Sequence, residues 1–288
     1  MNTLCRDISA FLEGKGFENS LQILDEIIII STKTRKGIPR TILPINLLSH
    51  STIEAVSYST VLQEHLDNFD NQLIIITEDR WNKQREMMQA RLLAHLDCFT
   101  SIYARNCEIH RIDKATAKAF LEANHSYGDA TCKYRYGLYL KRHTGHCHAE
   151  RSEASLSPGT LVAVATFSNA RKWIKGNKTI RSYEWTRYAS LPEVRLSGGM
   201  GKVLKAFINE VQPDDIMTYA DLEWSEGNVY EQLGFTLEGT KNPVTFVIDK
   251  HWMRYPIKTD ISIPEIPGAK YFQNFGSNKY RLKLTDYQ

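Results

Sequence analysis

The chain has 288 residues, of which 42% are apolar and 24% charged, and its formal net charge is +3. No apolar run approaches the ~20 residues that a membrane-spanning helix needs, and the N-terminus lacks the long apolar core of a secretory signal. We therefore expect a cytoplasmic protein with no membrane partner. Five cysteines without a CxxC pair argue against a disulfide framework or a structural zinc site, and the mildly basic charge permits an anionic partner.

The first third of the chain predicts a small α/β domain over residues 1–106. Apolar runs such as ILDEIIII and LIIIT indicate buried strands, and the polar-amphipathic stretch after LIIIT indicates a helix. The elements expected in chain order are a helix at 3–14, an apolar strand at 23–30, a basic turn at 32–40, a strand at 73–77 and a helix at 78–96.

The remaining residues, 107–288, predict a second and larger α/β domain. Asp113 is a predicted N-cap, because a helical pattern begins directly after it. The element order favours one mixed sheet with helices on both faces. The predicted strands are 108–112, 134–140, 160–168, 181–189, 215–221, 244–249 and 279–284, and the predicted helices are 113–125, 200–211 and 225–233.

One segment, residues 143–159, interrupts what would otherwise be a tight hairpin between two strands. It has no helical or strand periodicity, and part of it resembles the translated product of a dispersed bacterial repeat element. We interpret it as an inserted, flexible surface loop. It holds four residues whose side chains can bind metals, but a loop without a fixed backbone rarely orients ligands, so we predict no metal site. These residues are His143, His146, Cys147 and His148.

The stretch SGGMGK, residues 197–202, places three glycines directly before a predicted helix. It lacks the Lys-Ser/Thr ending of a Walker A loop and the third glycine of a dinucleotide fingerprint. A glycine-rich turn at a helix N-terminus still points backbone N–H groups at an anion, and Lys202 adds charge. The turn therefore predicts a diphosphate site, although a turn without a ligand would have the same sequence.

Downstream, YADLEWSEGNVYEQLGF at 219–235 resembles the last conserved block of the GNAT superfamily of acetyl-CoA-dependent N-acyltransferases. The resemblance implies a GNAT-like mixed sheet flanked by helices, with acetyl-CoA or a related acyl-CoA as cofactor and partner. It also implies that strands 181–189 and 215–221 splay around the pantetheine arm and that Tyr230 protonates the departing thiolate. One departure is Leu196, where the family has Gln or Arg, with Arg195 one place away. The implied cofactor-binding residues are Ser197, Gly198, Gly199, Met200, Gly201, Lys202 and Asn228.

A longer resemblance runs over residues 74–250. Blocks such as FLEANHSYG, VAVATFSNARK and YEWTRYA are similar to a GNAT-like module of phage and homing-endonuclease-associated proteins, where it follows a nuclease-like domain. They are more distantly similar to Mom-type phage enzymes, which modify adenine in DNA. The resemblance implies a nuclease-like relic in residues 1–106. The residues that match the Mom-type blocks are His125, Tyr127, Arg187, Ser197, Asp221 and Tyr230.

Acyl transfer to an amine needs a base for the amine proton and an acid for the leaving thiolate. Asp221, at the end of a strand, is a candidate base, and its alternative role is to cap the following turn. His125 closes a helix and is a base or a structural cap. Arg187 lies on a central strand and must meet a carboxylate or a phosphate if buried. Glu184, on the same strand, is its candidate partner or an alternative base.

A nucleic-acid partner is suggested by NARKWIKGNKTIR, residues 169–181, which interleaves basic side chains with a tryptophan. Cations neutralise phosphates and an aromatic ring stacks on bases, although an ordinary solvated hairpin is the alternative. The candidate contacts are Arg171, Lys172, Trp173, Lys175 and Lys178.

These observations together predict an acetyl-CoA-dependent N-acyltransferase that acts on DNA bases or on a DNA-associated acceptor. Two alternatives stay open. One is a small-molecule or protein N-acetyltransferase, and the other is a non-catalytic DNA-binding protein that retains the fold.

Overall fold

The fold is known from a computed structural model that describes residues 3–24, 27–47, 51–66, 73–141, 156–225, 227–257 and 268–287. The chain divides into two units, each built from separate stretches of sequence. Unit 1 comprises Met1–Cys98, Ala220–Glu226 and Thr240–Asn278, and unit 2 comprises Phe99–Tyr219, Gly227–Gly239 and Lys279–Gln288.

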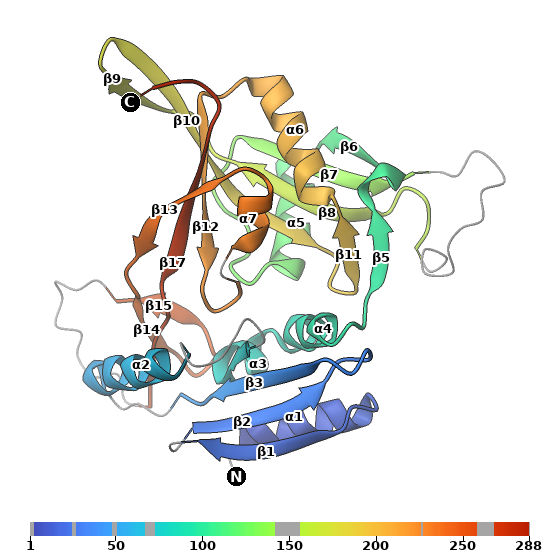
Figure 1. The fold of residues 1–288 in the computed structure, drawn as a ribbon, viewed down its shortest axis with the longest axis vertical. Coiled ribbons are helices and arrows are strands. Elements are labelled where there is room, and N and C mark those ends of the chain that lie inside the picture. Colours follow the sequence, from blue (N-terminus) through green and yellow to red (C-terminus); the bar gives the residue numbers. More distant parts are fainter. Residues whose placement is uncertain are drawn as a thin grey trace. The chain divides into compact units, whose positions relative to one another are not determined.

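Unit 1 contains a four-stranded sheet in the order β1-β2-β3-β4 (Figure 1). The predicted apolar run at 23–30 spans parts of two strands that form an antiparallel hairpin, while the predicted strand at 73–77 is β4 and pairs parallel to β3. The turn between β2 and β3 contains Gly37 with φ of +79°, which a glycine adopts without steric cost. The strands are β1 (Asn19–Leu24), β2 (Ile27–Lys33), β3 (Pro39–Ile45) and β4 (Leu73–Thr77).

The helices of unit 1 bury apolar side chains against this sheet. Leu4, Ile8 and Leu12 lie on one face of α1 and pack with the buried Trp81 and Leu92 of the later helices. The helix predicted at 78–96 is two helices, because the chain leaves helical geometry at residue 84. The helices are α1 (Thr3–Gly14), α2 (Thr52–Leu66), α3 (Glu78–Lys83) and α4 (Arg85–His95).

A segment near the C-terminus belongs to unit 1. It forms a three-stranded antiparallel sheet in the order β15-β14-β16, made of β14 (Thr245–Ile248), β15 (Arg254–Pro256) and β16 (Lys270–Gln273). Ile248 and Phe272 of this sheet share an apolar cluster with Ile45 and Leu62. The expected boundary between 106 and 107, with all later residues in one domain, therefore differs from this division. The strand predicted at 244–249 lies in unit 1, because burial of its apolar side chains against distant residues decides its place.

Unit 2 contains a larger mixed sheet in the order β13-β17-β12-β10-β8-β7-β6, with β9 paired to β10. Strands β6, β7, β8 and β10 pair antiparallel, and β12 pairs parallel to β10. The expected mixed sheet is confirmed. Its strands are β6 (Cys107–Arg111), β7 (Tyr134–Leu140), β8 (Leu161–Phe167), β9 (Arg171–Lys175), β10 (Lys178–Ser190), β12 (Asp215–Asp221), β13 (Thr236–Lys241) and β17 (Ser277–Lys283).

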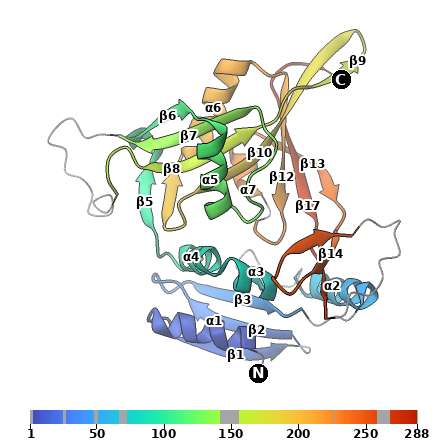
Figure 2. The same cartoon turned by 180° about the vertical axis from the view of Figure 1, so that it is seen from behind.

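Helices flank this sheet on both faces. Helix α6 (Gly199–Val211) lies in front of the sheet in Figure 1, and α5 (Lys114–Asn124) lies in front of it in Figure 2, which is the view from behind. Asp113 caps α5 as predicted, because its carboxylate accepts a hydrogen bond of 2.8 Å from the backbone N–H of Thr116. Phe207 of α6 stacks on Phe167 of β8 with ring centroids 3.9 Å apart.

Three shorter elements complete unit 2. Strand β5 (Thr100–Tyr103) pairs parallel to β11 (Val194–Ser197), which leads directly into the glycine turn, and a short 3-10 helix, η1 (Ala104–Asn106), follows β5. Helix α7 (Asn228–Gln232) follows the turn after β12. No helix in the described ranges is long and apolar enough to cross a membrane.

Most of the predicted insertion lies outside the described residues, including its three histidines and Cys147. The strands on either side of it, β7 and β8, pair antiparallel as a hairpin would. In the part of the chain that the structure describes, no group of three His, Cys, Asp or Glu residues is placed to hold a metal ion.

Candidate functional site

The glycine turn lies between β11 and α6. Gly198 has φ of +75° and is the N-cap of α6, where as a glycine it offers no side chain to cap the first turn. A Cβ on Gly199 would lie 2.5 Å from the Tyr188 hydroxyl and 2.7 Å from Leu196, so packing inside the chain excludes a side chain there. A Cβ on Gly201 would meet its nearest neighbour, Leu233, at 3.4 Å. The chain itself therefore requires glycine at 198 and 199, whereas at 201 it leaves room.

Lys202 does not reach out from this turn as expected. Its ammonium group donates to the carbonyl oxygen of Ala104 at 2.9 Å and to that of Cys107, so it holds the segment that follows β5. Two of its three N–H donors are thereby used. What the turn offers an anion is the set of backbone N–H groups at the start of α6 and the positive end of the helix dipole.

The remaining predicted residues near the turn differ in exposure. Ser197 and Met200 are half-buried, and Arg195 is exposed with its guanidinium 5.2 Å from the centre of the Phe99 ring. Tyr188 has a buried hydroxyl for which the described residues provide no hydrogen-bond partner, and burial raises its pKa. This hydroxyl faces Gly199, the first residue of the helix.

Strands β10 and β12 pair only at one end. The parallel backbone pairing runs from Ser182 opposite Asp215 to Glu184 opposite Met217. At the paired end the buried Asp215 accepts hydrogen bonds from Ser182 at 2.5 Å and from Arg281 at 2.7 Å. Directly after the last pair, β10 contains a bulge between Trp185 and Arg187 where its register against β8 shifts. Bulges re-aim side chains and are frequent beside active sites.

Tyr230, the predicted acid, lies on α7 next to the end of this pairing. Its ring packs against Trp185, Phe235 and Tyr280 with centroids 5.5–6.1 Å away. Thr218, which follows the last paired residue of β12, donates from its hydroxyl to the Trp185 carbonyl oxygen at 3.1 Å. Burial raises the pKa of Tyr230, so the phenol keeps its proton at neutral pH and is a proton donor.

Glu184 occupies the last paired position of β10 and is half-buried. Its backbone is fixed by Ser168, which donates from its N–H to the Glu184 carbonyl oxygen and accepts at its hydroxyl from the Glu184 N–H, each at 2.9 Å. The backbone of an acidic residue is thus fixed at the point where β10 leaves β12. Asn228, at the first position of α7, is exposed.

Arg187 and His125 lie in unit 2 as well. The guanidinium of Arg187 donates to the carbonyl oxygens of Gly128 at 3.1 Å and Thr186 at 2.8 Å, and it lies 5.9 Å from the centre of the Tyr127 ring. Among the described residues it forms no ion pair with a carboxylate, so the expected carboxylate partner is replaced by carbonyl groups. Burial lowers its pKa, while the charge of Glu184 opposes this effect.

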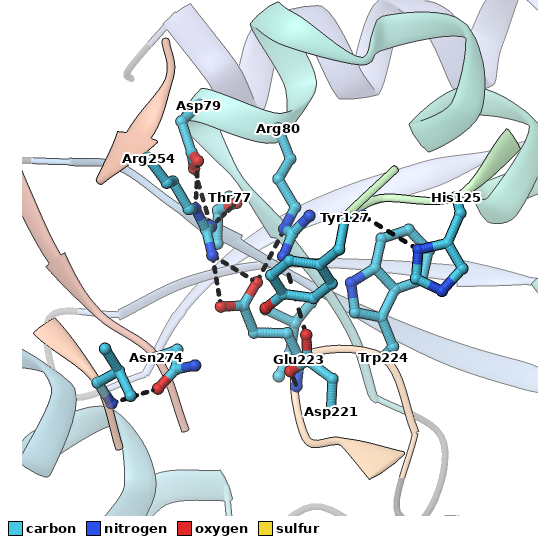
Figure 3. A network of polar contacts seen from close by, with 12 residues as sticks. Thr77, Asp79, Arg80, His125, Tyr127, Asp221, Glu223, Trp224, Arg254 and Asn274 are labelled. Atoms are coloured by element: carbon cyan, nitrogen blue, oxygen red, sulfur yellow. Dashed lines mark hydrogen bonds and ion pairs between the residues drawn. The ribbon is translucent and has the colours of Figure 1, made fainter. Parts of the chain in front are cut away.

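His125 is the C-cap of α5. Its N–H donates to Leu121 in the last turn of the helix, and its Nδ1 accepts from the Tyr127 N–H at 3.1 Å, a contact drawn in Figure 3. Because Nδ1 accepts, the proton of the neutral ring lies on Nε2. These contacts favour the structural role considered for His125.

Asp221 is the last residue of β12, and the division of the chain assigns it to unit 1. One of its carboxylate oxygens accepts from the Glu223 N–H at 3.0 Å, and the other lies 3.8 Å from the guanidinium of Arg80. Its carboxylate thus caps its own turn and compensates a cation. These contacts favour the structural alternative over the role of a base.

The sequence did not indicate a polar network in unit 1 that Figure 3 shows among the described residues. Arg254 contacts Asp79 at 2.5 Å and Glu223 at 2.7 Å, and it donates to the Thr77 hydroxyl at 2.9 Å. Arg80 contacts Glu223 at 3.0 Å. Burial by itself would raise the pKa of Glu223, but Arg254 and Arg80 outweigh it and hold this pKa below its usual range.

A third arginine extends this network. Arg91 donates to the carbonyl oxygens of Ile75 at 2.7 Å and Glu223 at 3.0 Å, and it stacks on the Trp224 ring at 4.2 Å. Burial, with a smaller effect of the charge on Arg80, lowers its pKa to about 10. The side chains of Asp79, Arg80 and Glu223 are nearly inaccessible to solvent, so the network is structural.

The predicted nucleic-acid contacts lie on the hairpin formed by β9 and the start of β10, at the upper left of Figure 1. Arg171, Lys172 and Lys178 are exposed, and Trp173 exposes 52% of its surface. Lys178 donates to the carbonyl oxygen of Asp286 at 3.2 Å. The backbone of Lys175 lies on the same hairpin.

Comparisons with known proteins were made on this basis. No protein-family model matches the chain, and no curated protein matches it. Among solved structures, it is similar to a protein from Corynebacterium glutamicum described as a histone acetyltransferase HPA2 and related acetyltransferase. That structure has a TM-score of 0.36 and 11% identity over 63% of this chain and 98% of that one.

Two further solved structures are similar to a comparable degree. A GNAT-family acetyltransferase from Bacillus anthracis has a TM-score of 0.33 and 15% identity, over 62% of this chain and 95% of that one. An N-acetyltransferase from Staphylococcus aureus Mu50 has a TM-score of 0.32 and 13% identity, over 62% and 99%. At these values the similarity decides neither the family nor the activity of this chain.

Proposed function

We propose that the protein is an acyl-CoA-dependent N-acyltransferase of the GNAT type and that unit 2 holds its active site. The observation that carries the proposal is the position of Tyr230. Its ring packs against Trp185, the residue that follows the last pair of β10 and β12, and Glu184 occupies that pair. A proton donor and an acidic residue thus both lie beside the separation of two parallel strands, which is where the sequence resemblance expects the cofactor arm.

The glycine turn fits the pyrophosphate of CoA by its backbone. The first turn of α6 has no side-chain cap, and Gly201 leaves room for close approach. The contact that a Cβ on Gly201 would make with Leu233 also shows that this turn lies beside the end of α7, the helix of Tyr230. Lys202 is engaged elsewhere, so we assign the attraction for phosphate to the N–H groups of residues 198–201 and to the helix dipole.

The chemistry follows from the two titratable groups at the strand separation. Acyl-CoA, when bound, supplies an activated thioester. The Tyr230 hydroxyl carries a proton, and its raised pKa keeps the phenol protonated at neutral pH. This proton can then be donated to the departing thiolate. Glu184 is the proposed base that accepts the proton of the acceptor amine. Asp221 is not assigned this role, because its carboxylate already accepts from Glu223 and lies near Arg80.

The acceptor is the finer part of the proposal, and we assign it to DNA. Arg187 has a half-buried guanidinium bonded only to carbonyl oxygens among the described residues, so it retains the capacity to bind a phosphate. The half-exposed Tyr127 ring beside it supports a planar acceptor group. His125 fixes the backbone of Tyr127, because its Nδ1 accepts from the Tyr127 N–H at 3.1 Å.

Calorimetric titration with acetyl-CoA tests the cofactor, and acetyl transfer to oligonucleotides and to simple amines tests the acceptor. We expect saturable binding of acetyl-CoA by the wild type and by Tyr230→Phe. The turnover of the variant should be lower than that of the wild type by a factor of about one hundred or more. Tyr255→Phe, which removes an exposed hydroxyl in unit 1, is the matched control and should retain full turnover. Absence of acetyl-CoA binding at millimolar concentration would remove the enzyme proposal. Full turnover of Tyr230→Phe would remove the assigned acid.

A further inference from the structure

The β9–β10 hairpin concentrates positive charge. Residues 169–181 contain five lysines and arginines and no acidic residue. The chain as a whole carries a formal charge of only +3, so the rest of the sequence is net negative. Arg171, Lys172 and Lys178 take part in none of the ion pairs formed by the described side chains. The hairpin is therefore an uncompensated cationic element on unit 2.

The pairing register places like charges opposite each other. Lys175 is the cross-strand partner of Lys178, and Lys172 is the partner of Arg181. Directly opposed like charges destabilise a β-hairpin. Arg181 has an acidic neighbour, Asp214, at 3.6 Å, whereas Lys172 and Lys178 form no ion pair among the described side chains. Binding of an anion would reduce this repulsion and stabilise the hairpin. The pattern of opposed cations is therefore typical of an element that binds an anion.

The same register separates the two exposed hydrophobic residues. Trp173 shares a face with Arg171 and Lys178, because side chains alternate along a strand and cross-strand partners lie on one face. Ile174, which exposes 83% of its surface, lies on the other face beside Lys172. The indole ring is thus flanked by cations on its own face of the hairpin.

We infer that this face of the hairpin binds a single-stranded segment of nucleic acid, with Trp173 stacked on a base and Arg171 and Lys178 against the neighbouring phosphates. Aromatic stacking on an unpaired base combined with backbone neutralisation is the usual physics of single-strand binding. A membrane surface fits less well, because the two apolar side chains face opposite ways and the turn at Gly176 lies between Lys175 and Lys178. The inference rests on the nucleic-acid acceptor proposed above and names the element that holds it.

Fluorescence anisotropy with a labelled 20-nucleotide oligo(dT), in the absence of acyl-CoA, tests this inference. We expect Trp173→Ala to raise Kd about fivefold or more without changing the salt slope, and Trp173→Phe to retain most of the affinity. The double variant Arg171→Gln/Lys178→Gln, which removes the two cations on the Trp173 face, should raise Kd about tenfold or more and reduce the slope of log K against log salt by about 1.4. Circular dichroism and the melting temperature check that each variant is folded.

Lys114→Gln/Lys118→Gln, which removes two exposed cations from α5, is the matched control and should bind as the wild type does. Equal weakening by the control would show attraction to net charge only and would overturn the inference. Binding of the oligonucleotide by Trp173→Ala with the wild-type Kd would also overturn the inference. So would binding to phosphatidylserine vesicles that is tighter than binding to the oligonucleotide and that the same variants abolish. Because binding is measured without cofactor, oligonucleotide binding by an inactive transferase contradicts only the catalytic proposal. Amine acetylation without oligonucleotide binding contradicts this inference and the DNA acceptor, and it leaves the acyltransferase proposal intact.

Discussion

Two arginines, Arg254 in unit 1 and Arg187 in unit 2, show how differently a fold can treat the same side chain. Arg254 is surrounded by Asp79, Glu223 and the Thr77 hydroxyl, and these carboxylates raise its pKa against the effect of burial. Arg187 contacts two carbonyl oxygens, and burial lowers its pKa. The first charge is compensated inside the chain, and the second is not.

The difference separates a structural role from a binding role. Burying an ion costs several kcal/mol unless opposite charges and hydrogen bonds replace its water, and in unit 1 they do. A ligand does not stabilise such a network further, whereas the removal of one member strongly destabilises the fold. Removing a half-buried arginine that is bonded only to carbonyl groups costs the protein less stability. Such an arginine is also the one that an anionic ligand stabilises most. Four variants or conditions test this contrast.

The largest expected effect is on the stability of unit 1. Glu223→Gln keeps the shape of the side chain but leaves Arg80 and Arg254 without their shared carboxylate. We expect a loss of about 3–5 kcal/mol in the free energy of unfolding, measured by urea denaturation. Glu108→Gln, which breaks an exposed contact with His110, is the control and should cost less than 1 kcal/mol. A similar small cost for both variants would contradict a structural role for the network.

Arg187→Gln is expected to show the opposite balance. It removes hydrogen bonds to two carbonyl groups, so the unfolding free energy should fall by only about 1–2 kcal/mol. If Arg187 binds a phosphate of the acceptor, KM for an oligonucleotide should rise at least about tenfold, with a smaller change in kcat. Lys118→Gln controls for charge. If Arg187→Gln lost as much stability as Glu223→Gln and left KM unchanged, the role of Arg187 would be structural.

The same contrast between a filled and an open position exists in the glycine turn. Gly199→Ala forces a methyl group against the Tyr188 hydroxyl and Leu196, and we expect a cost of about 1–3 kcal/mol in thermal or chemical unfolding. Gly201→Ala meets no such obstacle and should be neutral or slightly stabilising, because alanine favours helix. Gly201→Asp should in addition weaken acetyl-CoA binding by repulsion of phosphate. Equal stability costs at 199 and 201 would show that the turn is not packed as described.

The smallest effect is a pH dependence within unit 1. Burial, followed by the charges of Arg91 and Arg40, lowers the pKa of His95 from 6.5 to about 3. Between pH 6.5 and about 3, His95 is protonated in the unfolded chain but not in the folded chain. The free energy of unfolding therefore falls as the pH falls through this range. The slope is at most about 1.4 kcal/mol per pH unit. Below about pH 4.5, protonation of Asp79 and Glu223 adds to the loss, since their folded pKa values are also lowered.

Denaturation of His95→Gln between pH 6.5 and 4.5 isolates this contribution, because the carboxylates remain ionised there. The variant should lose most of the slope, whereas the exposed His110→Gln should keep it. An unchanged slope in His95→Gln would assign the pH dependence to another group.

Local elements were predictable because their signals are local. The α1 helix, strand β4, the Asp113 cap and the turn at Gly37 follow from periodicity, capping and backbone preference within a few residues. The break at residue 84 was missed because helical periodicity continues across it. The strand β14 was predicted, but its place in unit 1 was not, because Ile248 finds its apolar neighbours about 200 positions earlier in the chain.

The candidate site divides in the same way. The glycine turn, Tyr230 and the hairpin cations were recognisable from short motifs, whereas the engagement of Lys202 by the backbone near η1 was not. Asp79 and Arg80 looked like the solvated start of an amphipathic helix, and no local feature distinguishes them from exposed residues. Their burial depends on Arg254, which lies 175 residues away from Asp79.

The sequence by itself determined the mixed α/β class, most helices and strands, and the types of side chain available for chemistry, since these depend on patterns within one element. Only the tertiary structure decided which charges are compensated. It placed Asp221 in a capped turn, Arg187 against carbonyl oxygens and Tyr230 at the end of the β10–β12 pairing. The physical reason is that the energy of a charge depends on every group packed around it, and those groups come from segments that are distant in the chain.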